Sequence, residues 1–408
     1  MNATPAAAPP EAVDAERWPD VAQAPRSPLR AAAARQILRG AVRDLEVEVA
    51  LPDGRRLGRG GPTMEIVSDA FFHRIGADLK IGFGESYLAG DWRAAPGTDL
   101  AELLTVFARK LSTLVPPTLQ RFRKLIEQRM PSAELNDRQG ARSNIARHYD
   151  LSNDLFATFL DPTMSYSSAL FDGTDDLEQA QVRKIDNVLD LAGVQHGSHV
   201  LEIGTGWGQL AIQAARRGAT VTSVTLSTEQ RDLARKRIAE AGVEATVELR
   251  DYRDVEGRYD AVVSVEMIEA VGERYWPEYF ATVDRLLVPG GRFGLQAITM
   301  PDDRLQATRH AQGWIHKYIF PGGLIPSEPA IDRSAGNLAV VDRLAFGPDY
   351  ARTLRLWRDR FTAQAPAVDA LGFDHVFRRM WEFYLAYSEA GFRSGYLDVV
   401  QLALTRRT

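Results

Sequence analysis

The sequence HVLEIGTGWG occupies residues 199–208 and decides the fold. An apolar, β-branched run enters a loop with glycine at every second position, and a helical pattern follows at once. Glycine has no Cβ, so the backbone N–H groups of such a loop can approach a ligand closely. This order predicts the start of a nucleotide-binding α/β domain. A lone glycine loop is also found as an ordinary structural turn, so the neighbouring motifs must decide between the two interpretations.

The spacing of the glycines favours S-adenosylmethionine over a dinucleotide. Glu202 stands two residues before Gly204, and the loop reads G-x-G-x-G. A dinucleotide would bring a pyrophosphate to this loop, whereas S-adenosylmethionine brings a cationic amino acid that an acidic residue suits. We therefore expect Glu202, Gly204 and Gly206 to contact this cofactor.

Strand and helix patterns alternate after the loop. Strands are expected near residues 198–203, 219–224, 245–249, 261–265, 292–298, 338–344 and 396–404. Helices are expected after Gly208, over 227–241 with a capping box of Ser227 and Gln230, and over 276–287. The order predicts an α/β fold with a mostly parallel sheet. The alternation stops after Thr299 for about forty residues, a length of chain suited to cover a substrate at the sheet edge where ligands bind.

The length of 408 residues predicts two domains. Residues 1–25 are rich in alanine and proline and are expected to be disordered. Residues 26–130 are expected to form a small α+β domain that contains a hairpin with its turn at Pro52–Gly54 and basic amphipathic helices. Residues 131–143 read as a linker, and residues 144–408 as the second domain.

Composition excludes some classes of function. The net charge of −5 argues against nucleic acid as a partner. The chain has no cysteine, which excludes disulfides and zinc–thiolate sites, and no metal site is expected. No apolar run reaches transmembrane length and no signal peptide is evident, so a cytoplasmic protein is expected. Residues 103–130 form a basic amphipathic pattern, which fits either an anionic membrane surface or the solvated face of a packed helix.

Two further segments suit a nucleoside. Thr225 and Gln230 follow the second strand and can hydrogen-bond a ribose. Asp251 and Tyr252 follow the third strand, where a ring can stack on adenine and a carboxylate can accept from its amino group. A surface turn would equally explain this last pair.

Several motifs stand in a fixed order along the chain. They are RHYDLSND at 147–154, MSYSSA at 164–169, VTLSTEQ at 224–230, VEMIEAVG at 265–272 and WIHKYIFPGG at 314–323. With the glycine loop, they resemble the cyclopropane-fatty-acyl-phospholipid synthase family, whose members depend on S-adenosylmethionine. The resemblance runs from about Asn144 to the C-terminus, with a weaker match at LPDG (51–54) and GESYLAGDW (84–92). It implies a class I methyltransferase fold with an inserted lid, preceded by a smaller lipid-handling domain.

The resemblance also implies roles for single residues. It places cofactor contacts at Tyr166, Ser167, Gly204, Gly206, Thr225, Leu226, Gln230 and Tyr252. It places an active site, in which bound bicarbonate is the base, at Ser168, Glu269, Gln296, Ile298 and Tyr350. Ser168 stands where the family usually has cysteine, and Ala270 and Gln296 stand where it has histidine. Serine and glutamine can hydrogen-bond an anion but cannot relay a proton as histidine does, so sites with and without bicarbonate both stay open.

These departures, with LQAITM at 295–300, resemble the actinobacterial subgroup that makes tuberculostearic-type lipids. The resemblance implies methyl transfer to the cis double bond of an oleoyl-like chain on a phospholipid. Attack on the methyl group leaves a carbocation, and a hydride shift before proton loss gives a methylene branch that a separate reductase saturates. Direct proton loss gives a cyclopropane instead, as in a cyclopropane synthase. The residues also leave open a methyltransferase of a soluble small molecule and a lipid-binding protein without activity.

Glu269 is the candidate base, or the group that holds the base, unless it is only a buried structural carboxylate. The rings of Tyr318, Phe320 and Tyr350 are candidates to stabilise the cation, or plain packing residues. The expected partners are a phospholipid bilayer on the inner face of the cell membrane and the reductase. A homodimer is the default expectation for a protein of this kind.

Overall fold

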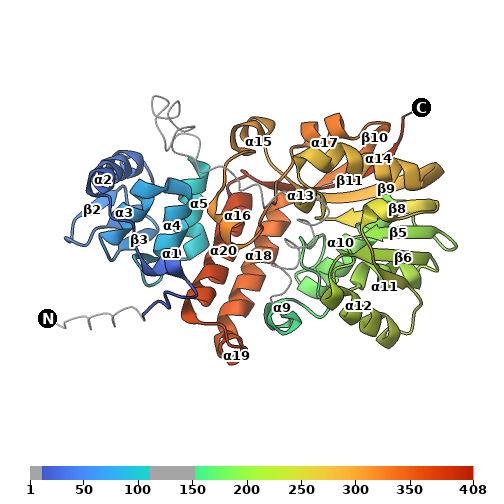
Figure 1. Cartoon of the computed structure of the whole chain (residues 1–408), viewed down its shortest axis with the longest axis horizontal. Coiled ribbons are helices and arrows are strands. Elements are labelled where there is room, and N and C mark those ends of the chain that lie inside the picture. The colour runs from blue at the N-terminus through green and yellow to red at the C-terminus, as the bar shows by residue number, and fades with distance from the viewer. Residues whose placement is uncertain (1–11, 111–151, 408) are drawn as a thin grey trace. The chain divides into compact units, whose positions relative to one another are not determined.

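The computed structural model of the chain describes residues 12–110 and 152–407 (Figure 1). Internal contacts divide the chain into two units, Met1–Glu127 with Ala365–Tyr387, and Gln128–Gln364 with Ser388–Thr408. The predicted linker at 131–143 and most of the basic amphipathic pattern at 103–130 lie outside the described residues. Within the described ranges, no helix has both the length and the apolar character needed to cross a bilayer.

The larger unit is built around a seven-stranded sheet with the order β10-β11-β9-β8-β5-β6-β7. Its strands are β5 (His199–Ile203), β6 (Thr220–Thr225), β7 (Thr246–Leu249), β8 (Tyr259–Val265), β9 (Leu287–Thr299), β10 (Leu338–Ala345) and β11 (Asp398–Arg406). Strands β5 to β9 pair in parallel, and β11 runs antiparallel to both β9 and β10. The mostly parallel sheet is therefore confirmed, and the parallel strands direct their carboxyl ends to one edge.

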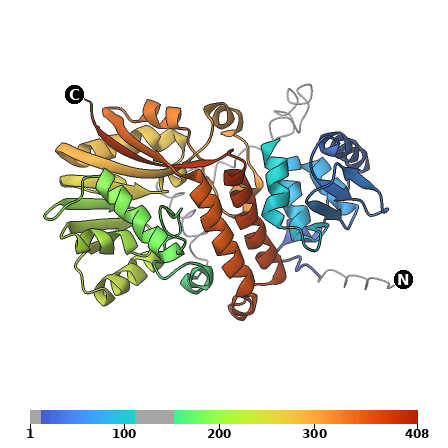
Figure 2. The same cartoon turned by 180° about the vertical axis from the view of Figure 1, so that it is seen from behind.

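Helices cover both faces of this sheet, as can be followed in Figures 1 and 2. The described helices within residues 152–364 are α9 (Asn153–Phe159), α10 (Leu177–Leu191), α11 (Gln209–Arg216), α12 (Thr228–Glu240), α13 (Ile268–Val271), α14 (Trp276–Leu286), α15 (Asp302–Thr308), α16 (Trp314–Tyr318), α17 (Glu328–Ser334) and α18 (Gly347–Ala363), with 3-10 turns η2 (Tyr252–Asp254) and η3 (Glu273–Tyr275). Successive residues of a strand point to opposite faces. Val200 accordingly packs with α10, α11 and α12, and Leu201 packs with α14.

The smaller unit carries a four-stranded sheet with the order β2-β1-β3-β4. Its elements are α1 (Pro19–Ala22), α2 (Pro28–Val42), β1 (Glu48–Ala50), β2 (Arg56–Gly58), β3 (Thr63–Ile66), α3 (Ala70–Ala77), α4 (Leu79–Leu88), β4 (Trp92–Ala94) and α5 (Leu100–Arg109). The predicted hairpin is confirmed, because β1 pairs antiparallel with β2 in a register that sets Glu48 opposite Gly58. The small α+β region is present as expected.

Two segments depart from the expected domain organisation. The predicted disorder of residues 1–25 does not hold at Pro19–Ala22, because the buried Arg74 guanidinium donates to the carbonyls of Asp20 (2.6 Å) and Val21 (2.5 Å). A buried cation needs such partners, and composition alone does not reveal them. The second departure is α19 (Ala365–Ala370) with the first part of α20 (His375–Arg393), which joins the smaller unit. There Tyr87 donates to Glu382 (3.1 Å), a pairing that helical periodicity cannot show.

Candidate active site

The glycine loop leaves β5 at the carboxyl edge of the sheet and turns into α11. Gly204, Gly206 and Gly208 have φ values of +96°, +51° and +91°, a region that favours glycine. A Cβ on Gly204 would lie 2.4 Å from Cγ of Met267, so close packing requires glycine there. A Cβ on Gly206 would meet no atom within 4 Å. The loop is thus a backbone cradle beside open space, which fits the predicted cofactor.

Glu202 lies just before this loop and is only 3% exposed. Its Oε2 accepts a hydrogen bond from Ser223 Oγ (2.5 Å), and that hydroxyl is also 2.7 Å from Thr205 Oγ1. Burial raises the pKa of Glu202 to about 8. A positive charge nearby would favour the ionised carboxylate, so this group fits a cationic ligand such as S-adenosylmethionine.

The predicted ribose contacts form one hydrogen-bonded turn at the end of β6. Thr225 Oγ1 donates to Gln230 Oε1 (2.8 Å), and Ser227 Oγ accepts from the backbone N–H of Gln230 (3.2 Å). Leu226 is half-buried in the same turn. The predicted capping box is only half formed, because the Gln230 side chain accepts from Thr225 instead of from the Ser227 backbone.

The two predicted adenine contacts, Asp251 and Tyr252, have different surroundings. Tyr252 is half-buried in η2, and its ring centroid lies 5.4 Å from that of Tyr279. The carboxylate of Asp251 accepts from the Nε (2.8 Å) and a terminal nitrogen (2.6 Å) of Arg253. Asp251 therefore holds its neighbour's guanidinium, whereas the Tyr252 ring packs edge-on against Tyr279.

Residues 164–168 approach the sheet edge from a preceding loop. The Tyr166 ring stacks on Trp357 with centroids 5.3 Å apart. The hydroxyl of Ser167 accepts from Nζ of Lys184, an amine on α10 that is 1% exposed. Burial lowers the pKa of Lys184 to about 8, although the charges of Glu266 and Asp161 act in the opposite direction.

Glu266 was not among the predicted site residues, yet it brings three of them together. It directly follows β8, and its Oε1 accepts from the backbone N–H of Ser168 (2.9 Å) and from Nε2 of Gln296 (2.8 Å). Its Oε2 accepts from the hydroxyl of Tyr350 at 2.7 Å. Three of the donors assigned by resemblance to a bicarbonate anion are therefore engaged by a carboxylate of the chain itself. A separate anion does not fit this arrangement, because it would meet a like charge in place of these donors.

Glu269 has a different environment one helical turn further on. Its Oε1 accepts from the backbone N–H of Ile298 (2.6 Å), and Leu324 of the inserted segment donates to its backbone carbonyl (2.8 Å). The residue as a whole is half-buried, but its Oε2 is enclosed and has no hydrogen-bond partner among the described residues. Burial, assisted by the nearby charge of Glu266, raises the pKa of Glu269 to about 8.

Most of the expected site residues thus lie at or just beyond the carboxyl ends of β5 to β9. Tyr166, Ser167 and Ser168 come from the loop that precedes α10, and Tyr350 comes from α18. Sequence reasoning missed Glu266, Lys184 and Gln401, although two signals were present. Glu266 is a charged residue directly after the apolar strand β8 and two residues before the short helix α13, and Lys184 stands at core spacing beside Ile185 on α10. Gln401 on β11 gave no such signal, because its partners come from distant segments.

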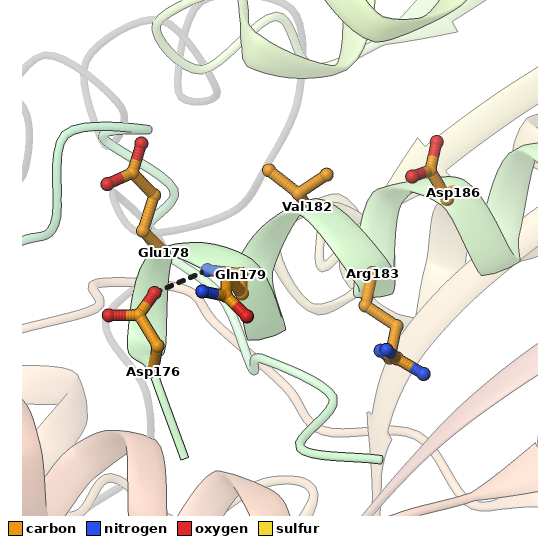
Figure 3. Close-up of a pocket in the computed structure, with 6 residues that line it drawn as sticks. All are labelled: Asp176, Glu178, Gln179, Val182, Arg183 and Asp186. Atoms are coloured by element: carbon orange, nitrogen blue, oxygen red, sulfur yellow. Dashed lines mark hydrogen bonds between the residues drawn. The ribbon is translucent and has the colours of Figure 1, made fainter. Parts of the chain in front are cut away.

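A separate surface hollow lies along the outward side of α10 (Figure 3). It is lined by Asp176, Glu178, Gln179, Val182, Arg183 and Asp186. Asp176 caps the helix by accepting from the backbone N–H of Gln179 at 2.8 Å. None of the predicted site residues lines this hollow, so we do not assign it to the site.

Comparisons with known proteins agree with this geometry. The chain is 54% identical to the tuberculostearic acid methyltransferase UfaA1 of Mycobacterium tuberculosis, over 98% of this chain and 97% of that protein. It is 34% identical to the cyclopropane-fatty-acyl-phospholipid synthase of Escherichia coli strain K12, over 86% of this chain and 89% of that protein.

Solved structures extend the agreement to the fold. The cyclopropane synthase MmaA2 from Mycobacterium tuberculosis and the mycolic acid cyclopropane synthase CmaA1 complexed with SAH and CTAB each match with a TM-score of 0.60 and 31% identity. Each match covers 64% of this chain and 97% of the other. The predicted class I methyltransferase fold is thereby confirmed. The family model for mycolic acid cyclopropane synthetase matches residues 136–402, and the chain therefore belongs to that family.

Proposed function

We propose that this protein transfers a methyl group from S-adenosylmethionine to the cis double bond of an oleoyl-like chain on a phospholipid. The product is a mid-chain methylene-branched acyl chain, the precursor of a tuberculostearic-type lipid. The observation that carries the proposal is the 54% identity, over nearly the whole chain, to a protein named tuberculostearic acid methyltransferase. The substitutions at Ser168, Ala270 and Gln296 support a product different from that of the cyclopropane synthases.

The cofactor would be held by groups at the ends of β5 and β6. Gly204 and Gly206 offer backbone, Glu202 offers a buried carboxyl, and the turn of Thr225 and Gln230 offers hydroxyl and amide groups. When bound, S-adenosylmethionine supplies a methyl group that forms a C–C bond with one alkene carbon as its S–CH₃ bond breaks.

The protein's own contribution is to exclude water and to direct proton loss. The new C–C bond leaves a cation on the neighbouring carbon, and aromatic faces stabilise a cation. The Tyr350 ring packs on Phe392 with centroids 4.5 Å apart, while its hydroxyl donates to Glu266. The position of the base relative to this cation decides between a methylene branch and a cyclopropane ring.

We place the protein at the inner surface of the cell membrane, where its phospholipid substrate is. The basic residues within 103–130 support attraction to an anionic lipid surface. Sedimentation with anionic vesicles tests this with Arg121→Glu and Arg123→Glu combined, which should weaken binding to anionic but not to neutral vesicles. Unchanged sedimentation with anionic vesicles would count against this surface. We further propose that a separate reductase saturates the methylene product. We also propose that the protein forms a homodimer, which analytical ultracentrifugation measures directly.

The function is tested by mass spectrometry of fatty acid esters. The protein is incubated with oleoyl phospholipid vesicles and methyl-deuterated S-adenosylmethionine. Ring and methylene products each lose one deuterium from the transferred methyl, so fragmentation must separate them. A mid-chain alkene branch supports the proposal, whereas a ring identifies a cyclopropane synthase, the activity that the E. coli relative's name states. No incorporation favours a soluble substrate or a protein without this activity.

A further inference from the structure

The backbone at Glu266 is strained in a way that points to its side chain. Among the described residues, Met164 and Glu266 are the non-glycine positions with positive φ, and the value at Glu266 is +51°. Such a conformation is unfavourable for a residue with a Cβ and persists where the surroundings impose it. Here the backbone N–H of Glu266 donates to the Gln296 carbonyl (2.8 Å), which fixes the residue at the end of β8. The strain aims a carboxylate at the edge of the sheet.

The carboxylate is held by donors from three other segments. Ser168 N–H and Gln296 Nε2 reach Oε1, and the Tyr350 hydroxyl reaches Oε2. A carboxylate has about four acceptor positions, so three donors orient it and leave one position on Oε2 for a proton. The position left on Oε2 lies beside the Tyr350 hydroxyl.

The donor from Gln296 is itself fixed by a buried chain of amides. Gln401 Nε2 donates to Gln296 Oε1 (2.8 Å), which turns the Gln296 amide nitrogen toward Glu266. Asn187 Nδ2 donates to Gln401 Oε1 (2.6 Å), and Gln401 also donates to the carbonyl of Lys184 (2.9 Å). Gln296 and Gln401 are both 0% exposed. Gln296 is therefore oriented to donate a hydrogen bond to a carboxylate, a role for which histidine is not needed.

The two acids of the VEMIEAVG motif, Glu266 and Glu269, differ in which protonation state their surroundings favour. Burial raises the pKa of Glu266, while Lys184 and the three hydrogen bonds stabilise its ionised form. Glu269 has one backbone donor, and its pKa is raised to about 8 partly by the charge of Glu266. The hydrogen-bond donors and Lys184 therefore favour the negative charge on Glu266, whereas the surroundings of Glu269 favour its protonated form.

Resting on the proposed function, we infer that Glu266 is the resident base of this enzyme and takes the place of a bound bicarbonate. After the hydride shift, the cation is on the carbon that carries the new methyl group. One C–H bond of that methyl breaks, its electron pair forms the C=C bond between the former methyl carbon and the chain carbon that bears it, and its proton passes to Oε2 of Glu266. Solvent then removes this proton, so the net release is one proton for each methyl transferred. The carboxylate also stabilises the developing cation.

Two substitutions at one position test the inference in buffer freed of carbon dioxide. Wild-type protein should turn over equally with and without added bicarbonate. Glu266→Gln keeps the shape but removes the base, and turnover should fall by about 100-fold or more without recovery on adding bicarbonate. Glu266→Gly removes the side chain at a position whose positive φ suits glycine, and leaves the three donors empty. Its turnover should also fall but should recover at least partly with added bicarbonate.

Binding of ¹³C-bicarbonate, followed by NMR line broadening, gives a readout that does not depend on turnover. The Glu266→Gly variant should bind the labelled anion and wild type should not. Calorimetric binding of S-adenosylmethionine reports whether each variant is folded, and exposed Glu278→Gln is the matched control that should leave turnover unchanged.

The inference is overturned if wild type binds bicarbonate and requires it, or if Glu266→Gln retains turnover within about threefold of wild type, far from the effect of losing a base. Failure of the proposed function looks different. In that case wild type incorporates no deuterium into lipid, and the NMR comparison still decides whether Glu266 fills the anion position.

Discussion

The glycine loop and the Glu266 cluster, here meaning Glu266 with Ser168, Gln296 and Tyr350, lie at the same sheet edge but are built in opposite ways. The loop is local, since all of its special backbone angles fall within five consecutive residues, 204–208. The cluster draws its donors from a loop, a strand and a helix that are far apart along the chain. The loop therefore depends on backbone conformation, and the cluster depends on long-range packing.

Because of this difference, substitutions in the loop and in the cluster should impair different properties, namely cofactor binding and turnover. A Cβ in the loop should damage cofactor binding, because the proposed cofactor would lie against the backbone itself. A lost hydroxyl or carboxylate in the cluster should damage turnover and leave cofactor binding intact.

The largest effect is expected from Gly204→Ala. The new Cβ would lie 2.4 Å from Met267 at a φ of +96°, so affinity for S-adenosylmethionine should fall by about 100-fold or more. Isothermal titration calorimetry measures this. Gly290→Ala is the matched control, because Gly290 also has positive φ (+79°) but no atom within 4 Å of the added Cβ. Equal losses in both variants would show that strain alone, not the close approach in the loop, matters.

Tyr350→Phe should lower turnover by about 10- to 100-fold, because it removes one charge-assisted hydrogen bond to Glu266. Affinity for the cofactor should change little, which separates the cluster from the loop. Steady-state kinetics on lipid vesicles and calorimetry together measure the two quantities. Tyr259→Phe is the control, since that hydroxyl contacts only an exposed backbone carbonyl at 3.3 Å in the described structure. A parallel loss of cofactor affinity would contradict the separation.

A third prediction concerns stability against pH. Glu269 has a pKa of about 8 in the folded protein and about 4.5 when unfolded, so between these values the folded state binds more protons than the unfolded state. The free energy of unfolding should therefore fall as pH rises from about 5 to 8, by up to about 1.4 kcal/mol per pH unit for this group. Urea unfolding at several pH values should show a shallower decline for Glu269→Gln. Exposed Glu278→Gln should leave the decline unchanged, and an unchanged slope in Glu269→Gln would argue that its carboxyl is ionised in the folded protein.

The smallest effect is expected from Ser227→Ala at the cap of α12. The change removes the acceptor for the Gln230 backbone N–H and should cost about 1 kcal/mol of stability. Thermal unfolding measures it, with exposed Thr228→Ala as the neighbouring control. A loss of several kcal/mol would mean that Ser227 stabilises the sheet edge through more than its hydrogen bond to the Gln230 backbone.

Much of the fold could be predicted from the sequence, because the patterns that indicate its strands, loops and turns each span only a few neighbouring residues. The β5 strand, the glycine loop and the Thr225–Gln230 turn each lie within a few residues, and motif order extended them to a fold. Residues 19–22 and 365–387 were assigned differently, because their place depends on a buried guanidinium and on which surface a helix covers. Ser168, Gln296 and Tyr350 were found by resemblance, but the carboxylate that joins them was not.

The parallel sheet and the glycine loop follow from the sequence alone, because β-α periodicity and glycine at positive φ are local requirements of the chain, and the order of the motifs indicates the family. Only the tertiary structure decided the chemistry of the two acids in VEMIEAVG. Glu266 and Glu269 are the same residue type three positions apart, yet one receives three hydrogen bonds and the other a single backbone bond. Burial and partners set the charge of a carboxyl group, and both are supplied by segments that only folding brings together.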